Sequence, residues 1–209
     1  MTPEEASRRF QKLVQMVNTD LALYIKDTVA HNASAAVALR VQETGKDFRG
    51  NSFKPYSTKP ILTSGTTSKG KAIWNKMGSG AKDRDLGYSV RGRGLRWVTI
   101  KRQGKNIHLF ELSGGYKQMR RLETLQTAYK DFSFSAMMWN HYGVKRTIKK
   151  AGEIEIIIGG KTQDSQDKID WNSKREGVEI INISDQELEK LAKQIDQHLQ
   201  KLINKAGLS

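Results

Sequence analysis

The clearest hint of chemistry is the stretch EIEIIIGGKTQDS, residues 153 to 165, where an apolar, strand-like segment runs into Gly-Gly-Lys-Thr. A phosphate-binding loop has the pattern G-x-x-x-x-G-K-[ST], because its first glycine turns backbone N–H groups toward the phosphates. Gly160, Lys161 and Thr162 match the end of that pattern, but Glu155 stands where the first glycine is required. The polar sequence QDSQDKIDWNS that follows has no apolar stripe, so we expect no helix facing a phosphate. We interpret Gly159-Gly160 as a turn that ends a strand.

Other residue types that do chemistry are scattered along the chain. The histidines His31, His108, His141 and His198 are far apart, and none has a metal-site partner three or four residues away. The chain has no cysteine, which excludes disulfides and thiolate metal sites. A nuclease can gather acidic side chains around magnesium from distant positions, so that class stays open as a weaker alternative. We expect no enzyme activity, no cofactor and no metal.

Positive charge is concentrated in the middle of the chain. The formal net charge is +14, and residues 45 to 150 hold 23 Lys and Arg against 6 Asp and Glu. The remaining residues hold 13 against 16. Such a block favours a polyanion or an acidic face of a protein partner, and charge alone does not separate the two.

The basic block contains the segment RGRGLRWVTIKRQGK, in which Arg91, Arg93 and Arg96 precede Trp97. Basic residues interleaved with an aromatic ring bind nucleic acid by pairing with phosphates and stacking on a base. The alternative is that alternate Lys and Arg form the solvated face of a hairpin while Trp97 contributes to the core. For the individual residues we favour the second interpretation.

Both ends of the chain carry helix signals. Thr2 is a suitable N-cap, Pro3 fits the first helical position, and Gly45 is placed to stop the helical region. Residues 28 to 43 form either a second helix or a continuation after a bend. Near the C-terminus, Ser184 and Glu187 form a capping box ahead of an apolar stripe, and Gly207 ends that helix.

The segments between these helices predict strands and long loops. Residues 95 to 102 and 107 to 112 have strand character and are joined by a turn at QGKN, while residues 116 to 129 suit a basic helix. EIEIII and VEIINI predict two more strands. The fold class is therefore α+β, with an N-terminal helix or helix pair, an antiparallel sheet with long basic loops or an arm, and a C-terminal helix.

We expect one domain over residues 1 to 209, in which residues 66 to 150 are a basic insertion or arm that is poorly ordered in the free subunit. The short apolar segments of this arm would promote aggregation if they were exposed to solvent. Their aromatic and Met-rich composition is typical of the centres of protein interfaces. No apolar run approaches the roughly 20 residues that span a bilayer. The predicted subunit or partner contacts are Trp97, Phe110, Phe134, Met138, Trp139, Arg91, Arg93 and Arg96.

One stretch carries a family resemblance. The segment ALRVQETGKDFRGNSFKPYS, followed by ILTSG, resembles the phage virion-morphogenesis or tail-completion family, in which a helix leads into a G-x-D-x-x-G-x-x-W-x-P-L-S turn. Phe53 replaces the usual Trp. The ending REGVEIINISDQELEKL is also similar, although it lacks the family's Pro and Gly, and residues 66 to 150 have no counterpart. The matching turn positions are Gly45, Asp47, Gly50, Phe53, Pro55, Tyr56 and Ser57.

The resemblance implies a structural virion protein of the head–tail junction, assembled in the host cytoplasm, that joins the portal to the tail. It implies a closed ring of about six or twelve copies that contacts the portal and other neck or tail proteins, with DNA passing through its lumen. The alternative is a basic nucleic-acid-binding protein that acts directly on DNA.

Overall fold

The computed structural model describes residues 2–64, 95–122, 125–133, 137–150 and 153–208, which form two compact units. The helical unit comprises residues 1–53 and 131–209, and the basic unit comprises residues 54–130. The basic unit holds 17 Lys and Arg against 4 Asp and Glu, and the helical unit holds 19 against 18. The division therefore separates charge as well as contacts, and residues 131–150 group with the helical unit and not with the predicted arm.

One long helix spans residues 3 to 44. It consists of α1 (Pro3–Met16), α2 (Ala22–Tyr24) and α3 (Ala30–Leu39), with the π-helical turns η1 (Val17–Leu21), η2 (Ile25–Val29) and η3 (Arg40–Thr44) after them. A capping box between Thr2 and Glu5 starts the helix, and Gly45 ends it in the left-handed conformation at φ 62°. Residues 28 to 43 thus continue the N-terminal helix, and the predicted cap and stop are confirmed.

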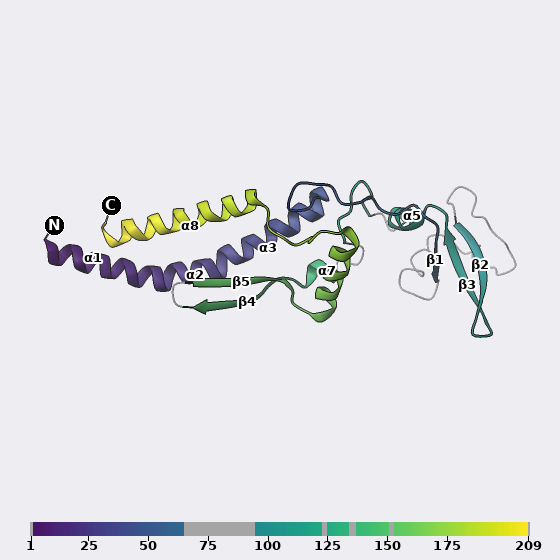
Figure 1. Ribbon diagram of the computed structural model, residues 1–209, viewed down its shortest axis with the longest axis horizontal. Helices are drawn as coiled ribbons and strands as arrows, with labels where there is room; N and C mark the ends of the chain where they lie inside the picture. Colours follow the sequence, from purple (N-terminus) through teal and green to yellow (C-terminus); the bar gives the residue numbers. More distant parts are fainter. Residues whose placement is uncertain (1, 65–94, 123–124, 134–136, 151–152, 209) are drawn as a thin grey trace. The chain divides into compact units, whose positions relative to one another are not determined.

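The C-terminal helix α8 (Asp185–Ala206) runs antiparallel to the long helix (Figure 1). Its predicted capping box between Ser184 and Glu187 and its stop at Gly207 are both present. At the other end of the pair, Arg9 Nη1 donates to the Gly207 carbonyl at 2.6 Å and Lys12 Nζ donates to the Lys205 carbonyl at 3.2 Å. These cations satisfy carbonyls that the last helical turn leaves without a partner.

A β-hairpin and a short helical pair complete the helical unit. β4 (Tyr142–Lys150) and β5 (Glu153–Gly160) form a two-stranded antiparallel sheet with a bulge between Val144 and Arg146. α6 (Met137–Asn140) precedes the hairpin and α7 (Gln163–Glu176) follows it. The main core joins these elements to the long helix, and its buried side chains are Val37, Val41, Phe53, Met138, Tyr142, Ile169 and Ile180.

The strand predicted for VEIINI is wrong, because residues 178 to 183 connect α7 to α8 without strand pairing. Val178 N donates to the Ser173 carbonyl, and Ile180 N donates to Ser173 Oγ. The backbone donors are thus satisfied locally, while Ile180 is fully buried in the core. The apolar run contributes side chains to the core, and its β-branched composition does not determine its backbone conformation.

In the basic unit, the described residues form a three-stranded antiparallel sheet in the order β1-β3-β2 and one helix. Its strands are β1 (Ile61–Ser64), β2 (Leu95–Arg102) and β3 (Lys105–Leu112), and its helix is α5 (Gly115–Leu122). Gln103 and Gly104 turn the β2–β3 hairpin with φ of 51° and 73°, which confirms the predicted turn. The helix is shorter than predicted, and the chain beyond it folds back, since Arg120 Nε donates to the Gln126 carbonyl at 2.9 Å.

The start of the predicted arm lies largely in residues 65–94, outside the described residues. The expectation that the arm is poorly ordered in the free subunit therefore stays a prediction. Within the described part of the chain, no helix combines the length and apolar character needed to cross a membrane. The α+β class itself is confirmed.

Candidate partner-binding surfaces

The turn that carries the family resemblance is closed by the side chain of Asp47. Its Oδ1 accepts hydrogen bonds from Arg49 N at 2.9 Å and Asn51 N at 2.8 Å. Asp47 N donates to the Asn51 carbonyl, and Gly50 adopts φ 83°. Asp47 is only 6% exposed, so its carboxylate is committed to holding the turn. The predicted tight turn is confirmed.

Aromatic residues fix both ends of this turn, each within its own unit. Phe53 is buried in the core of the helical unit and meets Phe132 edge-on at 5.0 Å between ring centroids. Tyr56 is buried in the basic unit, where the Arg120 guanidinium lies 4.4 Å from its ring centroid. Phe53 thus packs on the long helix, while Tyr56 packs on α5. Pro55 is exposed between them.

The start of α5 is fitted closely to the segment after Tyr56. Lys117 N donates to the Ser57 carbonyl at 3.0 Å. A Cβ added to Gly115 would lie 2.2 Å from the Lys59 carbonyl oxygen, and Gly115 has φ 63°. The motif position Ser57 therefore has a structural role through its backbone, and a glycine is needed opposite it.

The Gly-Gly-Lys-Thr segment joins β5 directly to α7. Thr162 is the N-cap of α7, and its Oγ1 accepts from Ser165 N at 3.2 Å. Gly160 N donates to Gln166 Oε1, and Lys161 N donates to the His141 carbonyl. The predicted strand-ending turn is confirmed. The prediction that no helix follows is wrong, because α7 needs only a narrow buried edge at Ser165 and Ile169.

We expect the Lys161→Ala variant to behave like the wild type, because Lys161 is exposed and the Thr162 hydroxyl is engaged as a helix cap. Its free energy of unfolding should change by less than about 0.5 kcal/mol, as for an ordinary surface substitution. ATP with magnesium should leave the melting temperature of both proteins unchanged, since only a ligand that binds the folded state raises it. Nucleotide-dependent stabilisation of the wild type that is lost in the variant would contradict this interpretation.

Two of the predicted interface residues pack in or against the core of the helical unit. Met138 is 3% exposed and packs among core residues of the helical unit. Trp139 packs beside it, meets Tyr142 edge-on at 5.3 Å and donates from Nε1 to the Asp131 carbonyl at 2.9 Å. Met138 is therefore a core residue of the subunit and not an anchor for a partner, whereas Trp139 is only partly buried, so its role at an interface stays a prediction.

Three of the remaining predicted contacts lie on the β2–β3 hairpin of the basic unit. Trp97 pairs with Phe110 across the β2–β3 hairpin, and Arg96 lies opposite Glu111. Arg91, Arg93 and Phe134 lie outside the described residues. The hairpin thus brings Trp97 and Phe110 together in register, and their predicted role at an interface stays a prediction.

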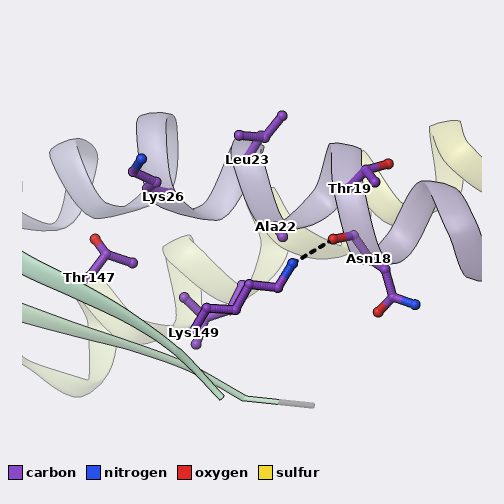
Figure 2. A pocket seen from close by; sticks show the side chains of 8 residues that line it. Asn18, Thr19, Ala22, Leu23, Lys26, Thr147 and Lys149 are labelled. Atoms are coloured by element: carbon purple, nitrogen blue, oxygen red, sulfur yellow. Dashed lines mark hydrogen bonds between the residues drawn. The ribbon is translucent and has the colours of Figure 1, made fainter. Parts of the chain in front are cut away.

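A groove missed by the sequence analysis runs along the long helix. It has a volume of about 560 Å³ and is bordered by the long helix, the tip of the β4–β5 hairpin and α8. A neighbouring hollow of about 420 Å³ lies between the turn η1 and the hairpin (Figure 2). There Lys149 Nζ donates to the Asn18 carbonyl at 2.9 Å, which gives a backbone acceptor in the π-helical turn a partner (Figure 2). The groove is mainly apolar, and its floor includes Leu21, Ile25, Ile154, Leu191 and Ile195.

The histidines and acidic residues show no metal centre in the part of the chain that the structure describes. His198 stacks face to face on Tyr24, with ring centroids 3.9 Å apart, so it packs between α8 and the long helix. His31 and His141 are exposed. Burial raises the pKa of the Tyr142 hydroxyl well above its usual range, the Arg40 guanidinium opposes this effect, and Glu187 adds to it.

The Tyr142 hydroxyl is buried without a hydrogen-bond partner among the described residues. Replacing Tyr142 by Phe should therefore stabilise the protein by about 1 kcal/mol, because it removes a desolvated polar group. The unfolded chain ionises Tyr142 near pH 10 while the folded chain keeps it protonated, so wild-type stability should fall as the pH rises above about 10. The difference between the urea midpoints of the two proteins should widen there. A Phe variant that is less stable at neutral pH would show that the hydroxyl has a partner.

Comparison with known proteins does not add a relative. The chain matches no protein-family model, no curated protein and no solved structure. Expectations that come from the resemblance around residues 45 to 57 therefore depend on the sequence pattern and on the physical arguments for the described residues.

Proposed function

We propose that this chain is a structural virion protein of the phage head–tail junction, where identical copies form a closed ring that joins the portal to the tail. The observation that carries this proposal is the division of charge between the two units. The helical unit is near neutral, with 19 cationic against 18 acidic residues, whereas the basic unit has 17 against 4. The helical unit is suited to contacts with its own copies, and the basic unit is suited to an acidic neighbour.

This division matters physically because like charges oppose self-association. Near-neutral surfaces pack against copies of themselves without long-range repulsion, so the helical unit suits contacts between subunits. Basic units bring many positive charges close together in a ring and need an acidic neighbour to offset the repulsion. A portal or tail protein provides such a neighbour, and DNA passing through the lumen provides another.

The test is the copy number and symmetry of the chain in particles of the phage that encodes it, with native mass spectrometry of the purified full chain at low and high concentration. We expect a ring of about six or twelve copies, either in solution or in a cryo-electron microscopy map of the neck. Absence of the chain from purified particles, or its presence as an isolated or asymmetric component, would overturn the proposal.

The second candidate function is direct binding to DNA, and the net charge of the basic unit favours it. A protein that neutralises about 6 to 10 phosphates loses about 10³ to 10⁵ in affinity between 50 and 200 mM salt. Fluorescence anisotropy with a labelled duplex at both salt concentrations measures this directly. Tight binding with that salt dependence, together with absence from the neck, would favour this candidate over the ring.

A further inference from the structure

Among the described residues, neither edge of the β4–β5 hairpin of the helical unit is paired with a further strand. The hairpin is a two-stranded sheet, so each of its strands has a neighbouring strand on one side only in that part of the chain. In the described part of the chain, the one other hydrogen bond made by the backbone of these strands runs from Gly160 N to Gln166 Oε1. A row of unpaired N–H and C=O groups is a template for another strand, and a two-stranded sheet gains stability when a third strand is added.

The two strands carry opposite charge. The exposed cations of β4 are Lys145, Arg146, Lys149 and Lys150, and β4 has no acidic residue. The charged residues of β5 are Glu153 and Glu155. Within the hairpin, Lys150 Nζ lies 3.3 Å from Glu155 Oε2, so charges of the two strands already pair across the sheet.

These charges select which edges can meet. Lysines and a bulge on an edge strand discourage pairing with strands of unrelated chains, and β4 has both features. Pairing β4 with β4 of another copy would set cations against cations, and pairing β5 with β5 would bring no cation to the two carboxylates of either strand. The pairing that brings opposite charges together is β4 of one copy against β5 of the next.

We infer that the β4–β5 hairpin is the contact between subunits, in which the β4 edge of one copy pairs with the β5 edge of a second copy. Such a contact is head-to-tail, so it propagates from copy to copy and closes into a ring where the rotation allows. The inference rests on the proposed ring and deepens it, since it names the surface through which the copies meet.

The absence of cysteine allows a clean cross-linking test. Single cysteines are placed on β4 in one chain and on β5 in another, at positions that pair within the hairpin and lie on one face of it. The two chains are mixed, oxidised mildly and resolved on a non-reducing gel, both as purified protein and in assembled particles. A disulfide requires Cα atoms about 4.4 to 6.8 Å apart, so it reports strand adjacency. The β4 variants are Arg146→Cys, Ile148→Cys and Lys150→Cys, and the β5 variants are Glu153→Cys, Glu155→Cys and Ile157→Cys.

We expect cross-linked dimers from β4–β5 mixtures, confined to pairs that share one register, and none from β4–β4 or β5–β5 mixtures. If the chains form a ring but β4–β5 mixtures do not cross-link, the inference is wrong and the ring stands. If the chain forms no ring in solution or in particles, the proposed function fails together with the inference. Dimers from β4–β4 mixtures alone would indicate a two-fold contact and overturn the inference.

Charge reversal provides a second, independent test. One variant carries Lys145→Glu and Arg146→Glu on β4, and the other carries Glu153→Lys and Glu155→Lys on β5. Each variant alone sets like charges against each other and should enter rings at least tenfold less well than the wild type. An equal mixture should restore assembly, because the reversed β4 of one variant meets the reversed β5 of the other. A control with Lys190→Glu and Lys201→Glu, two exposed positions on α8, should assemble normally. Failure of the mixture with both variants folded by circular dichroism would overturn the inference.

Discussion

A Gly160→Ala variant is expected to lose about 3 kcal/mol of unfolding free energy, an effect at the upper end for an overpacked site. An added Cβ would lie 2.3 Å from Gln166 N and 2.7 Å from the Ser165 carbonyl carbon. Both atoms belong to the backbone of α7, so no side-chain rotation relieves the overlap and the helix must move away from β5. Urea denaturation followed by circular dichroism measures the loss.

Gly159 and Gly177 provide matched controls for this variant. A Cβ on Gly159 would approach Gln166 Oε1 at 2.8 Å and Lys145 Cδ at 3.0 Å, and both atoms belong to flexible side chains. Gly177 has φ 75° with no atom near its added Cβ, so its alanine variant should lose about 1 to 2 kcal/mol from the left-handed backbone alone. If Gly160→Ala destabilises no more than Gly177→Ala, the close contact between β5 and α7 is not rigid.

The Gly-Gly-Lys-Thr segment shows where sequence reasoning succeeded and where it failed. The strand, the turn and the missing first glycine were readable from local pattern. The helix α7 was missed because its buried edge includes Ser165, whose Oγ donates to the Met138 carbonyl at 2.9 Å. A serine interrupts an apolar stripe in the sequence, and the carbonyl that accepts its hydrogen bond is 27 residues away. The periodicity of apolar residues does not reveal such a distant hydrogen-bond partner.

Helix boundaries were the most predictable part of the fold because their signals are local. Thr2 with Glu5, Ser184 with Glu187, and the left-handed glycines Gly45 and Gly207 act within one turn of each helix end. The limits of the predicted arm were not predictable from charge. The cations of β4 extended the basic block to residue 150, yet β4 pairs with β5 inside the helical unit. Charge along a sequence does not report which segments contact each other.

The candidate surfaces were also predictable only where their signals are local in the sequence. The turn around Asp47 was predictable, because an Asp side chain accepts hydrogen bonds from nearby backbone N–H groups and Gly readily adopts the positive φ of a tight turn. The groove along the long helix was not, since α8 and the hairpin border it from distant parts of the sequence. Met138 and Trp139 were predicted as partner contacts because aromatic and Met-rich segments suit both interfaces and cores. The burial of Met138 assigns that residue to the core, whereas Trp139 is only partly buried against it.

The second large effect is expected at Arg40, which connects the end of the long helix to the start of α8. Its Nε donates to Glu187 Oε1 at 2.9 Å, Nη1 donates to the Lys46 carbonyl at 3.1 Å, and Nη2 donates to the Asn182 carbonyl at 2.6 Å. The side chains of Arg40 and Glu187 are only 14% and 10% exposed. Replacing Arg40 by Ala should therefore lower the free energy of unfolding by about 3 kcal/mol, because a largely buried carboxylate and two carbonyls lose their donor.

Further substitutions distinguish the ion pair from the rest of this network. Glu187→Gln should be milder than Arg40→Ala, because an amide keeps an acceptor for Arg40 while removing the charge. The double variant Arg40→Met with Glu187→Leu should recover part of the loss, since apolar side chains of similar size avoid an unpaired buried charge. Lys193→Ala, which breaks an exposed pair with Glu189 on α8, should change stability by less than about 0.5 kcal/mol. Equal effects of Arg40→Ala and Lys193→Ala on the urea midpoint would show that the Arg40 network does not hold the two helices together.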